Sequence, residues 1–437
     1  MNPITRKNLL AIITVAAWAM FAASVDLAAQ QEKSLHQFAQ YGTDGWAPSA
    51  PLIVDSAGNL YGTTQSYGFG GYGSVFELTP AAGGLWTEKI LYAFTNKADG
   101  HTPAAPLVFD NAGNLYGTTF GGGAYDHGTV FELTPNADGS WTEKILHSFD
   151  NNGTDGAYVY GGLALDITGS LYGMTLEGGD STCTDNAKFG CGIVFQLTPT
   201  PAGYWKEKIL HTFTHNGVDG TLPYAGLTLD ASGNLYGATS RGGANGYGTV
   251  FRMKHAAGAW TETISHSFNR NGVDGVYPLS TPALDNSGNL YGVTLEGGVN
   301  LSCPNGGYGC GTVFQLSPNA GGGWKERVLH SFADDGQDGY YPYGNLVVDA
   351  SGSLYGTTST GGTASNSVYG SGTVYKLKPL TGGVWGETLL YSFNYSFGGT
   401  DGAFPNAGLV FGPFGSLYGT TSQGGLSDVG IVFEVKP

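Results

Sequence analysis

The sequence predicts an all-β fold: a seven-bladed β-propeller of four-stranded antiparallel blades, closed by an N-terminal strand that completes the last blade. Three observations support it: a long repeat, four strand-like runs in each repeat, and complementary fragments at the two chain ends. The tripeptide LYG marks the repeat, with spacings of 55 to 64 residues. Its seven copies begin at Leu60, Leu115, Leu171, Leu235, Leu290, Leu354 and Leu417. Such a period, with turn residues between short strands, is typical of propellers.

One complete unit, residues 106–149, contains the runs PLVFD, NLYGTT, GTVFELT and WTEKILHSF. The segments between them, NAG, GGGAYDH and PNADGS, are rich in the Gly, Asn and Asp that turns require. The 74 glycines are therefore expected to punctuate strands, while 13% aromatic residues supply a core. The spacing from Asp110 to Gly113 suits a tight hairpin between the first two strands.

The two ends of the chain complement each other. The last unit runs through GLVFG, SLYGTT and GIVFEVKP and has no fourth strand. The segment KSLHQF at residues 33–38 matches the fourth-strand ends KILHSF (144–149) and KILHTF (208–213). The first and last blades of a closed ring are neighbours, so we expect residues 33–38 to pair with residues 430–436. This pairing would remove an open sheet edge.

Residues 1–29 are predicted to be a secretory signal peptide. Arg6 and Lys7 form its basic region, the apolar run extends from Leu9 to Ala23, and Ala29 offers a cleavage site. An uncleaved N-terminal anchor is the alternative, although this run is short for a membrane span of about 20 residues. We expect residues 30–437 to form a single domain that is secreted or lies in the cell envelope, extracellular or periplasmic.

The cysteines and the charge balance limit the partners. Cys183 and Cys191 lie in one loop and Cys303 and Cys310 in another. Export favours a disulfide in each pair over a zinc site, which would need closer spacing or histidine partners. The formal net charge of −16 argues against nucleic acid and anionic membranes. We expect a monomer with no membrane span after signal cleavage, whose partner is an extracellular glycan or protein.

Two recurrent residues of the fourth strand have structural interpretations. A tryptophan begins this strand in six units and is expected to pack between blades. These residues are Trp86, Trp141, Trp205, Trp260, Trp324 and Trp385. A histidine recurs further along the strand, but Tyr92 and Tyr391 replace it in two units, which favours packing or hydrogen bonding over metal binding. The histidines are His36, His147, His211, His266 and His330.

The loop from each fourth strand to the next blade carries an aspartate followed by glycine. The seven aspartates are Asp44, Asp99, Asp155, Asp219, Asp274, Asp338 and Asp401. Each is expected to cap its own turn, and the alternative is that some contact a ligand or cation. Calcium takes about six to eight oxygens, so one aspartate per blade is too sparse without help. We therefore expect no metal and no cofactor, with calcium as a weak alternative.

Aromatic residues follow these turns and are expected on the same face of the ring. Aromatic faces beside carboxylates suit sugars, whose rings stack while their hydroxyls form hydrogen bonds. Packing against the neighbouring blade is the alternative interpretation. The candidate ligand-binding residues are Trp46, Tyr224, Tyr277, Tyr340, Tyr341 and Tyr343.

No catalytic motif such as GxSxG or HExxH is present, and no catalytic residue is assigned. The least repetitive charged feature consists of Glu177, Arg241 and Glu296, at corresponding positions of blades three, four and five. A polysaccharide lyase or hydrolase could place an acid, a base and a substrate-binding arginine there. Loop variation explains the pattern equally well.

The repeat GNLYGTTxxGG…YGTVFELTP, which recurs through residues 33–437, resembles the GloVer tandem repeat of exported bacterial proteins described as choice-of-anchor tandem repeat proteins. The resemblance implies a secreted or surface-displayed protein and assigns no ligand or reaction. The sequence shows no C-terminal sorting tail of the anchored members, which favours secretion. Our leading hypothesis is a non-catalytic binding module with carbohydrate as its ligand class. The alternatives are an extracellular polysaccharide-processing enzyme and a structural envelope protein without a defined ligand.

Overall fold

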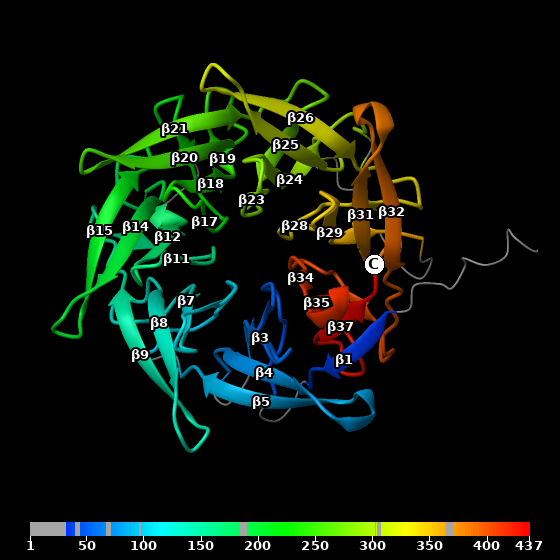
Figure 1. Ribbon diagram of the computed structural model, residues 1–437, viewed down its shortest axis with the longest axis horizontal. Helices are drawn as coiled ribbons and strands as arrows, with labels where there is room; N and C mark the ends of the chain where they lie inside the picture. The colour runs from blue at the N-terminus through cyan, green and yellow to red at the C-terminus, as the bar shows by residue number, and fades with distance from the viewer. Residues whose placement is uncertain are drawn as a thin grey trace, which may run out of the picture.

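The computed structural model describes residues 32–39, 44–66, 71–95, 98–183, 190–301, 303, 307–363 and 370–437. Within these ranges the chain forms seven four-stranded antiparallel blades around a central axis (Figure 1). This is the predicted seven-bladed propeller. The predicted signal peptide, residues 1–29, lies outside the described residues. In the described part of the chain, no helix is long and apolar enough to cross a membrane.

Each blade is built from four strands in chain order, from the axis outward (Figure 1). Blade one has β2 (Ile53–Val54), β3 (Leu60–Thr64), β4 (Ser74–Pro80) and β5 (Trp86–Ala93). Blade two has β6 (Val108–Phe109), β7 (Leu115–Thr119), β8 (Thr129–Pro135) and β9 (Trp141–Ser148). Blade three has β11 (Ala164–Leu165), β12 (Leu171–Thr175), β14 (Ile193–Pro199) and β15 (Trp205–Thr212). Blade four has β17 (Thr228–Leu229), β18 (Leu235–Thr239), β20 (Thr249–Ala256) and β21 (Ala259–Ser267).

The remaining blades follow the same plan. Blade five has β23 (Ala283–Leu284), β24 (Leu290–Gly297), β25 (Thr312–Pro318) and β26 (Trp324–Ser331). Blade six has β28 (Val347–Val348), β29 (Leu354–Thr358), β31 (Thr373–Pro379) and β32 (Trp385–Ser392). Blade seven has β34 (Val410–Phe411), β35 (Leu417–Thr421), β37 (Ile431–Val435) and, from the other end of the chain, β1 (Lys33–Gln37). The described residues also form the short 3-10 turns η1 (Ala82–Gly84), η3 (Thr381–Gly383) and η4 (Pro413–Gly415).

The N-terminal strand closes the ring, as the sequence predicts. β1 pairs antiparallel with β37, so that Lys33 lies opposite Glu434 and Gln37 opposite Ile431. The Phe38 N–H adds a hydrogen bond of 3.1 Å to the Gly430 carbonyl. Figure 1 shows β1 beside β37 in this blade. The outer edge of β37 is therefore covered by the chain itself.

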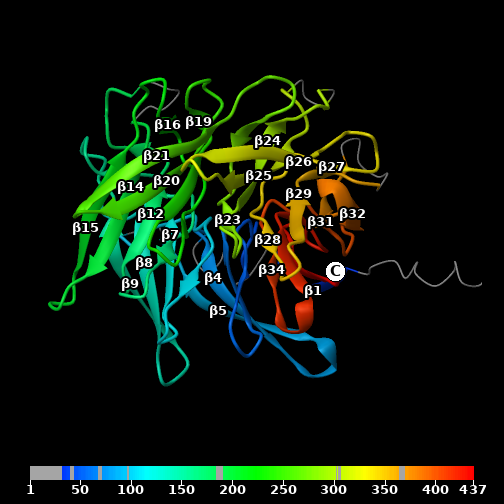
Figure 2. The same cartoon turned by 45° about the horizontal axis from the view of Figure 1, so that its top comes forward.

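Short strand pairs join the loops on one face of the ring. In each pair, the segment after the aspartate-glycine turn runs beside the start of the connection between the second and third strands. Figure 2 shows β16, β19 and β27 on this face. The pairs are β10 (Gly156–Ala157) with β13 (Glu177–Gly178), β16 (Gly220–Thr221) with β19 (Arg241–Gly242), β22 (Gly275–Pro278) with β24, β27 (Gly339–Tyr340) with β30 (Thr360–Gly361), and β33 (Gly402–Ala403) with β36 (Gln423–Gly424).

The core of the ring lies between blades. A buried phenylalanine follows each fourth strand and meets, edge to face, an aromatic ring on the third strand of the next blade, with centroids 5.1–5.4 Å apart. The glycine of LYG makes room for the second ring. A Cβ atom on Gly117 would lie 2.5 Å from the Phe131 ring and 2.8 Å from Leu107. The pairs are Phe38–Phe76, Phe94–Phe131, Phe149–Phe195, Phe213–Phe251, Phe268–Phe314, Phe332–Tyr375 and Phe393–Phe433.

The repeated tryptophans also pack between blades, as expected. The Trp205 ring meets the LYG tyrosine of the preceding blade, Tyr116, with centroids 6.0 Å apart. Equivalent pairs are Trp86–Tyr418, Trp260–Tyr172, Trp324–Tyr236 and Trp385–Tyr291. The first hairpin is as tight as predicted, because Asp110 Oδ1 accepts the N–H groups of Ala112 and Asn114 at 2.8 and 2.9 Å. These contacts give a rigid frame for the loops.

Candidate functional site

The junction aspartates fix the loops that lead from one blade to the next. Asp155 Oδ1 accepts the Gly156 N–H at 2.6 Å, and its Oδ2 accepts the Asp150 N–H at 3.0 Å. His147 Nε2 lies 3.3 Å from the same carboxylate. A hydrogen bond from the outer strand's His or Tyr to the junction aspartate recurs at all seven junctions. The aspartates thus hold turns, as the turn interpretation expects.

Three residues after each junction aspartate, the backbone adopts a left-handed conformation without glycine. The φ angle of Tyr158 is 62° and that of Tyr277 is 60°. A hydrogen bond to the preceding blade holds this strained backbone, because the Tyr158 N–H donates to the His127 carbonyl at 2.8 Å and the Tyr277 N–H to the Tyr247 carbonyl at 3.0 Å. The seven residues are Ala47, Thr102, Tyr158, Leu222, Tyr277, Tyr341 and Phe404.

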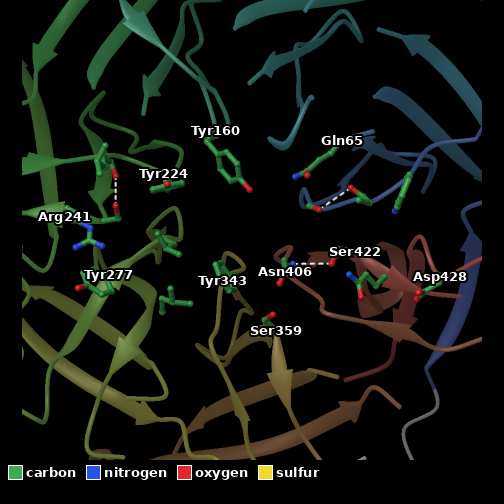
Figure 3. Close-up of a pocket in the computed structure, with 18 residues that line it drawn as sticks. Gln65, Tyr160, Tyr224, Arg241, Tyr277, Tyr343, Ser359, Asn406, Ser422 and Asp428 are labelled. Atoms are coloured by element: carbon green, nitrogen blue, oxygen red, sulfur yellow. Dashed lines mark hydrogen bonds between the residues drawn. The ribbon is translucent and has the colours of Figure 1, made fainter. Parts of the chain in front are cut away.

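The junction loops converge on a cavity of about 1020 Å³ at the centre of the ring (Figure 3). The residue five positions after each junction aspartate reaches this region. These residues are Ser49, Ala104, Tyr160, Tyr224, Leu279, Tyr343 and Asn406, and all but Ala104 line the cavity. Three tyrosines therefore stand on one part of its rim, although the backbone repeats sevenfold.

Several of these tyrosines are accessible. Tyr160 and Tyr343 are each 39% exposed. The Tyr160 and Tyr224 rings meet edge to face, with centroids 5.6 Å apart. Figure 3 shows Tyr160, Tyr224 and Tyr343 directed toward the central space. Gln65 and Asn406 add amide groups to the same lining, so the cavity combines aromatic faces with hydrogen-bonding groups.

The structure brings together four of the six predicted ligand-binding residues. Trp46, Tyr224, Tyr277 and Tyr343 line the cavity. Tyr340 is only 1% exposed and lies in the core between blades five and six. Tyr341 packs edge to face on Tyr340, with centroids 5.1 Å apart, and is outside the cavity lining. The left-handed backbone at Tyr341, with φ of 56°, turns these successive side chains in different directions.

The cavity lining includes one basic residue, Arg241, and one acidic residue, Asp428, and these two residues have different partners. The Arg241 guanidinium lies 4.6 Å from the centre of the Tyr277 ring. Asp428 Oδ2 accepts the Tyr395 hydroxyl at 2.9 Å, and its Oδ1 accepts the Gly424 N–H at 3.1 Å. Arg241 and Asp428 stand on opposite sides of the cavity in Figure 3. The acidic group is thus held by the protein, whereas the basic group lies against an aromatic face.

The three catalytic candidates do not surround one cavity. Arg241 lines the axial cavity, but Glu177 and Glu296 do not. Glu296 Oε2 instead accepts the Tyr308 N–H of its own loop at 2.9 Å. Of these three residues, Arg241 is therefore the one that belongs to the axial cavity.

Both predicted disulfides are present. Cys183 is bonded to Cys191 and Cys303 to Cys310, with Cα atoms 5.7 and 5.4 Å apart. Each bridge supports the following junction. The Cys191 carbonyl accepts the Leu222 N–H at 3.1 Å, and the Cys310 carbonyl accepts the Tyr341 N–H at 3.0 Å. The disulfide loops therefore hold two of the left-handed residues around the cavity.

A cluster of histidine, aspartate and glutamate recurs between blades, away from the axial cavity. A glutamate on the fourth strand of the next blade approaches each junction pair: Glu207 Oε1 lies 3.7 Å from His147 Nε2. In four of these clusters, the three side-chain atoms that could bind a metal lie within 4.8 Å of one another. Histidine and carboxylate side chains could hold a divalent metal. The clusters are His36–Asp44–Glu88, His147–Asp155–Glu207, His211–Asp219–Glu262 and His330–Asp338–Glu387.

A proton on the glutamate would also relieve the repulsion between the carboxylates of these clusters. Burial raises the pKa of Glu207 to about 7, and the Asp155 carboxylate adds to the rise while His147 opposes it. Burial alone would also raise the pKa of Asp155, but hydrogen bonds from His147 and Asp150 hold that pKa below its ordinary value. The Oε1 atom of each junction glutamate is buried without a hydrogen-bond partner, and a proton there would let it donate one. The seven are Glu32, Glu88, Glu143, Glu207, Glu262, Glu326 and Glu387.

The sequence carried signals for residues that the first interpretation left out. Gln65 and Asn406 belong to the lining, and the five-residue offset from the junction aspartate identifies Asn406. The junction glutamates follow a Trp-x-Glu spacing, as in Trp205 and Glu207, which recurs in six units. Alignment of the repeats by these offsets would have found both sets.

Comparison with known proteins identifies the family. The model of the Gloeobacter/Verrucomicrobia repeat matches residues 21–185 and 181–433, which is most of the chain. A search of curated proteins found no match. The two disulfides and this bacterial repeat family fit an extracellular or envelope protein, and the repeat and propeller fold fit a binding or interaction module. The chain belongs to the Gloeobacter/Verrucomicrobia repeat family, the GloVer repeat that the sequence resembles.

Proposed function

We propose that the protein is a secreted, monomeric, non-catalytic binding module whose axial cavity binds a carbohydrate. The observation that carries the proposal is the arrangement of Tyr160, Tyr224 and Tyr343 around one cavity. Aromatic faces stack on the C–H faces of sugar rings, and a few polar groups then fix the hydroxyls. Gln65 and Asn406 supply such groups in the same lining.

The size and rigidity of the cavity support this proposal. Its volume of about 1020 Å³ lies at the upper end of typical ligand sites, which hold about 300–1,000 Å³. An oligosaccharide of a few units would fill such a space. Tyr160 and Tyr343 occupy equivalent positions in two rigid junction loops, so little ordering should accompany binding.

The test is calorimetric titration of the purified full chain with a panel of oligosaccharides, with chromatography of the sugars after incubation. We expect saturable binding without new products. Tyr343→Ala and Tyr160→Ala should each weaken binding by up to about tenfold, because stacking on one ring contributes roughly 0.5–1.5 kcal/mol. Tyr204→Ala is the matched control, since Tyr204 is 61% exposed and outside the cavity lining.

Three outcomes would overturn the proposal. Binding of no oligosaccharide would remove carbohydrate as the ligand class. Release of reducing ends or unsaturated sugars would replace the module with an enzyme. Equal loss of binding in Tyr343→Ala and Tyr204→Ala would show that the axial cavity is not the site.

A further inference from the structure

We propose that the sugar bound in the axial cavity carries an anionic group, a carboxylate or a sulfate, and that Arg241 binds this group. The inference rests on the proposed function and names the ligand class of the same site. It depends on the position of Arg241, on the absence of a partner for its charge among the described residues, and on the partners of two acidic groups on the same face of the ring.

The fold holds Arg241 at the cavity wall. Its strand β19 pairs with β16, so that Arg241 lies opposite Thr221 in register. The guanidinium rests on the Tyr277 ring at 4.6 Å, which orients its planar face without using its N–H groups. Figure 3 shows Arg241 beside Tyr224 and Tyr277 on one wall of the cavity.

The charge of Arg241 has no protein partner in the described ranges. No ion pair or side-chain hydrogen bond joins Arg241 to another described residue, although the chain has 34 acidic and 18 basic residues. Two lysines on the outer strands, by contrast, do have hydrogen-bond partners. Lys89 donates to the Gly139 carbonyl at 2.6 Å, and Lys144 to the Gly203 carbonyl at 2.9 Å.

Two acidic side chains of the loop face accept hydrogen bonds from the protein itself. Asp428 accepts from Tyr395 and Gly424, and Glu296 accepts from Tyr308. Among the described residues none pairs with the guanidinium fork, which can bind an external anion through two parallel hydrogen bonds. The net charge of −16 repels anions at long range, so recognition must depend on this local contact. A sugar ring beside Tyr224 would place its acidic substituent within reach of Arg241.

The test compares oligogalacturonate, a sulfated galactose oligomer and a neutral galactose oligomer of equal length, titrated into the full chain. Arg241→Gln should weaken binding of an anionic oligomer about tenfold to hundredfold, because hydrogen bonds to charged groups are worth roughly 1.5–3 kcal/mol. Binding of the neutral oligomer should change less than about threefold. Arg241→Lys should recover part of the affinity for the sulfated oligomer and less for the carboxylated one, since lysine lacks the planar fork.

The chain offers a matched control. Arg270 also rests on a tyrosine ring, 3.8 Å from the centre of Tyr308, but it is outside the cavity lining. Arg270→Gln changes the net charge equally and should leave both affinities unchanged. Equal losses in the two variants would overturn the inference, because a general charge effect would then explain them. Neutral binding as tight as anionic binding would overturn it and leave the proposed function standing, whereas no binding of any oligomer would overturn both.

Discussion

The free energy of unfolding should fall as the pH rises from 5 to 8, because seven glutamates between the blades keep protons that the unfolded chain releases. Burial raises the pKa of Glu207 from 4.5 to about 7, and that of Glu88 to about 8. Since each folded-state pKa lies above its unfolded value, the stabilisation is complete below about pH 4.5 and is lost as the pH rises to the folded pKa.

The groups beside each glutamate also favour a free energy of unfolding that falls as the pH rises from 5 to 8. The groups around Glu207 are His147, Asp155 and Asp150. Burial alone would lower the pKa of His147, but Asp155 and Glu207 raise it above its usual range, so its contribution is also lost as the pH rises. Asp155 has a lowered pKa, so its contribution is lost only as the pH falls below about 4.

The magnitude follows from the shift at one junction. A rise from 4.5 to about 7 at Glu207 corresponds to about 3 kcal/mol. The Glu207 side chain is 19% exposed, and screening by solvent reduces this to about 1–2 kcal/mol per junction. Loss of this stabilisation at all seven junctions should lower the melting temperature by roughly 10 °C or more between pH 5 and 8.

The assay is thermal unfolding followed by circular dichroism at several pH values, on the wild type and Glu207→Gln. Glutamine can donate to Asp155 at any pH, so the variant should match the wild type near pH 5 and exceed it by about 1–2 kcal/mol near pH 8. Glu132→Gln, on β8 away from the junctions, should keep the wild-type profile. A wild-type melting temperature that is constant or rises from pH 5 to 8 would refute the reasoning.

Three further predictions concern the frame. Trp205→Ala should lower the free energy of unfolding by about 3 kcal/mol through the lost contact with Tyr116, measured by denaturant titration; a loss below about 1 kcal/mol would contradict that packing role. Replacing Cys183 and Cys191 by serine should cost about 2 kcal/mol, because the loop is short, and should also weaken ligand binding; unchanged melting would contradict it. A chelator should leave the melting temperature within about 1 °C, and a larger fall would indicate a metal in the clusters between blades.

The sequence predicted the frame of this protein because the frame repeats. The spacing of LYG, the four runs in each unit and the split last blade each reflect strand pairing, which the local pattern of residues determines. The contact between His147 and Glu207 was harder to foresee. It joins two different blades, and neither residue is unusual within its own strand.

The residues that line the cavity were predicted less well, for a different physical reason. Tyr340, Tyr341 and Tyr343 are near neighbours in sequence and were expected to act together. The left-handed backbone at Tyr341 separates them, so Tyr340 enters the core while Tyr343 reaches the cavity. A positive φ at a non-glycine residue is rare, and composition alone does not reveal it.

The same repetition explains where a function can reside in this fold. The junction aspartate and the glycine after it cannot vary freely, because the carboxylate closes the loop and a side chain on Gly156 would overlap Thr175. The residue five positions after the junction aspartate does not close the loop. At this position the seven units carry Ser, Ala, Tyr, Tyr, Leu, Tyr and Asn. Sequence change at that position alters the cavity without altering the frame. A ligand in this protein is therefore best sought where the repeats differ, on the side of the ring that holds the tyrosines and Arg241.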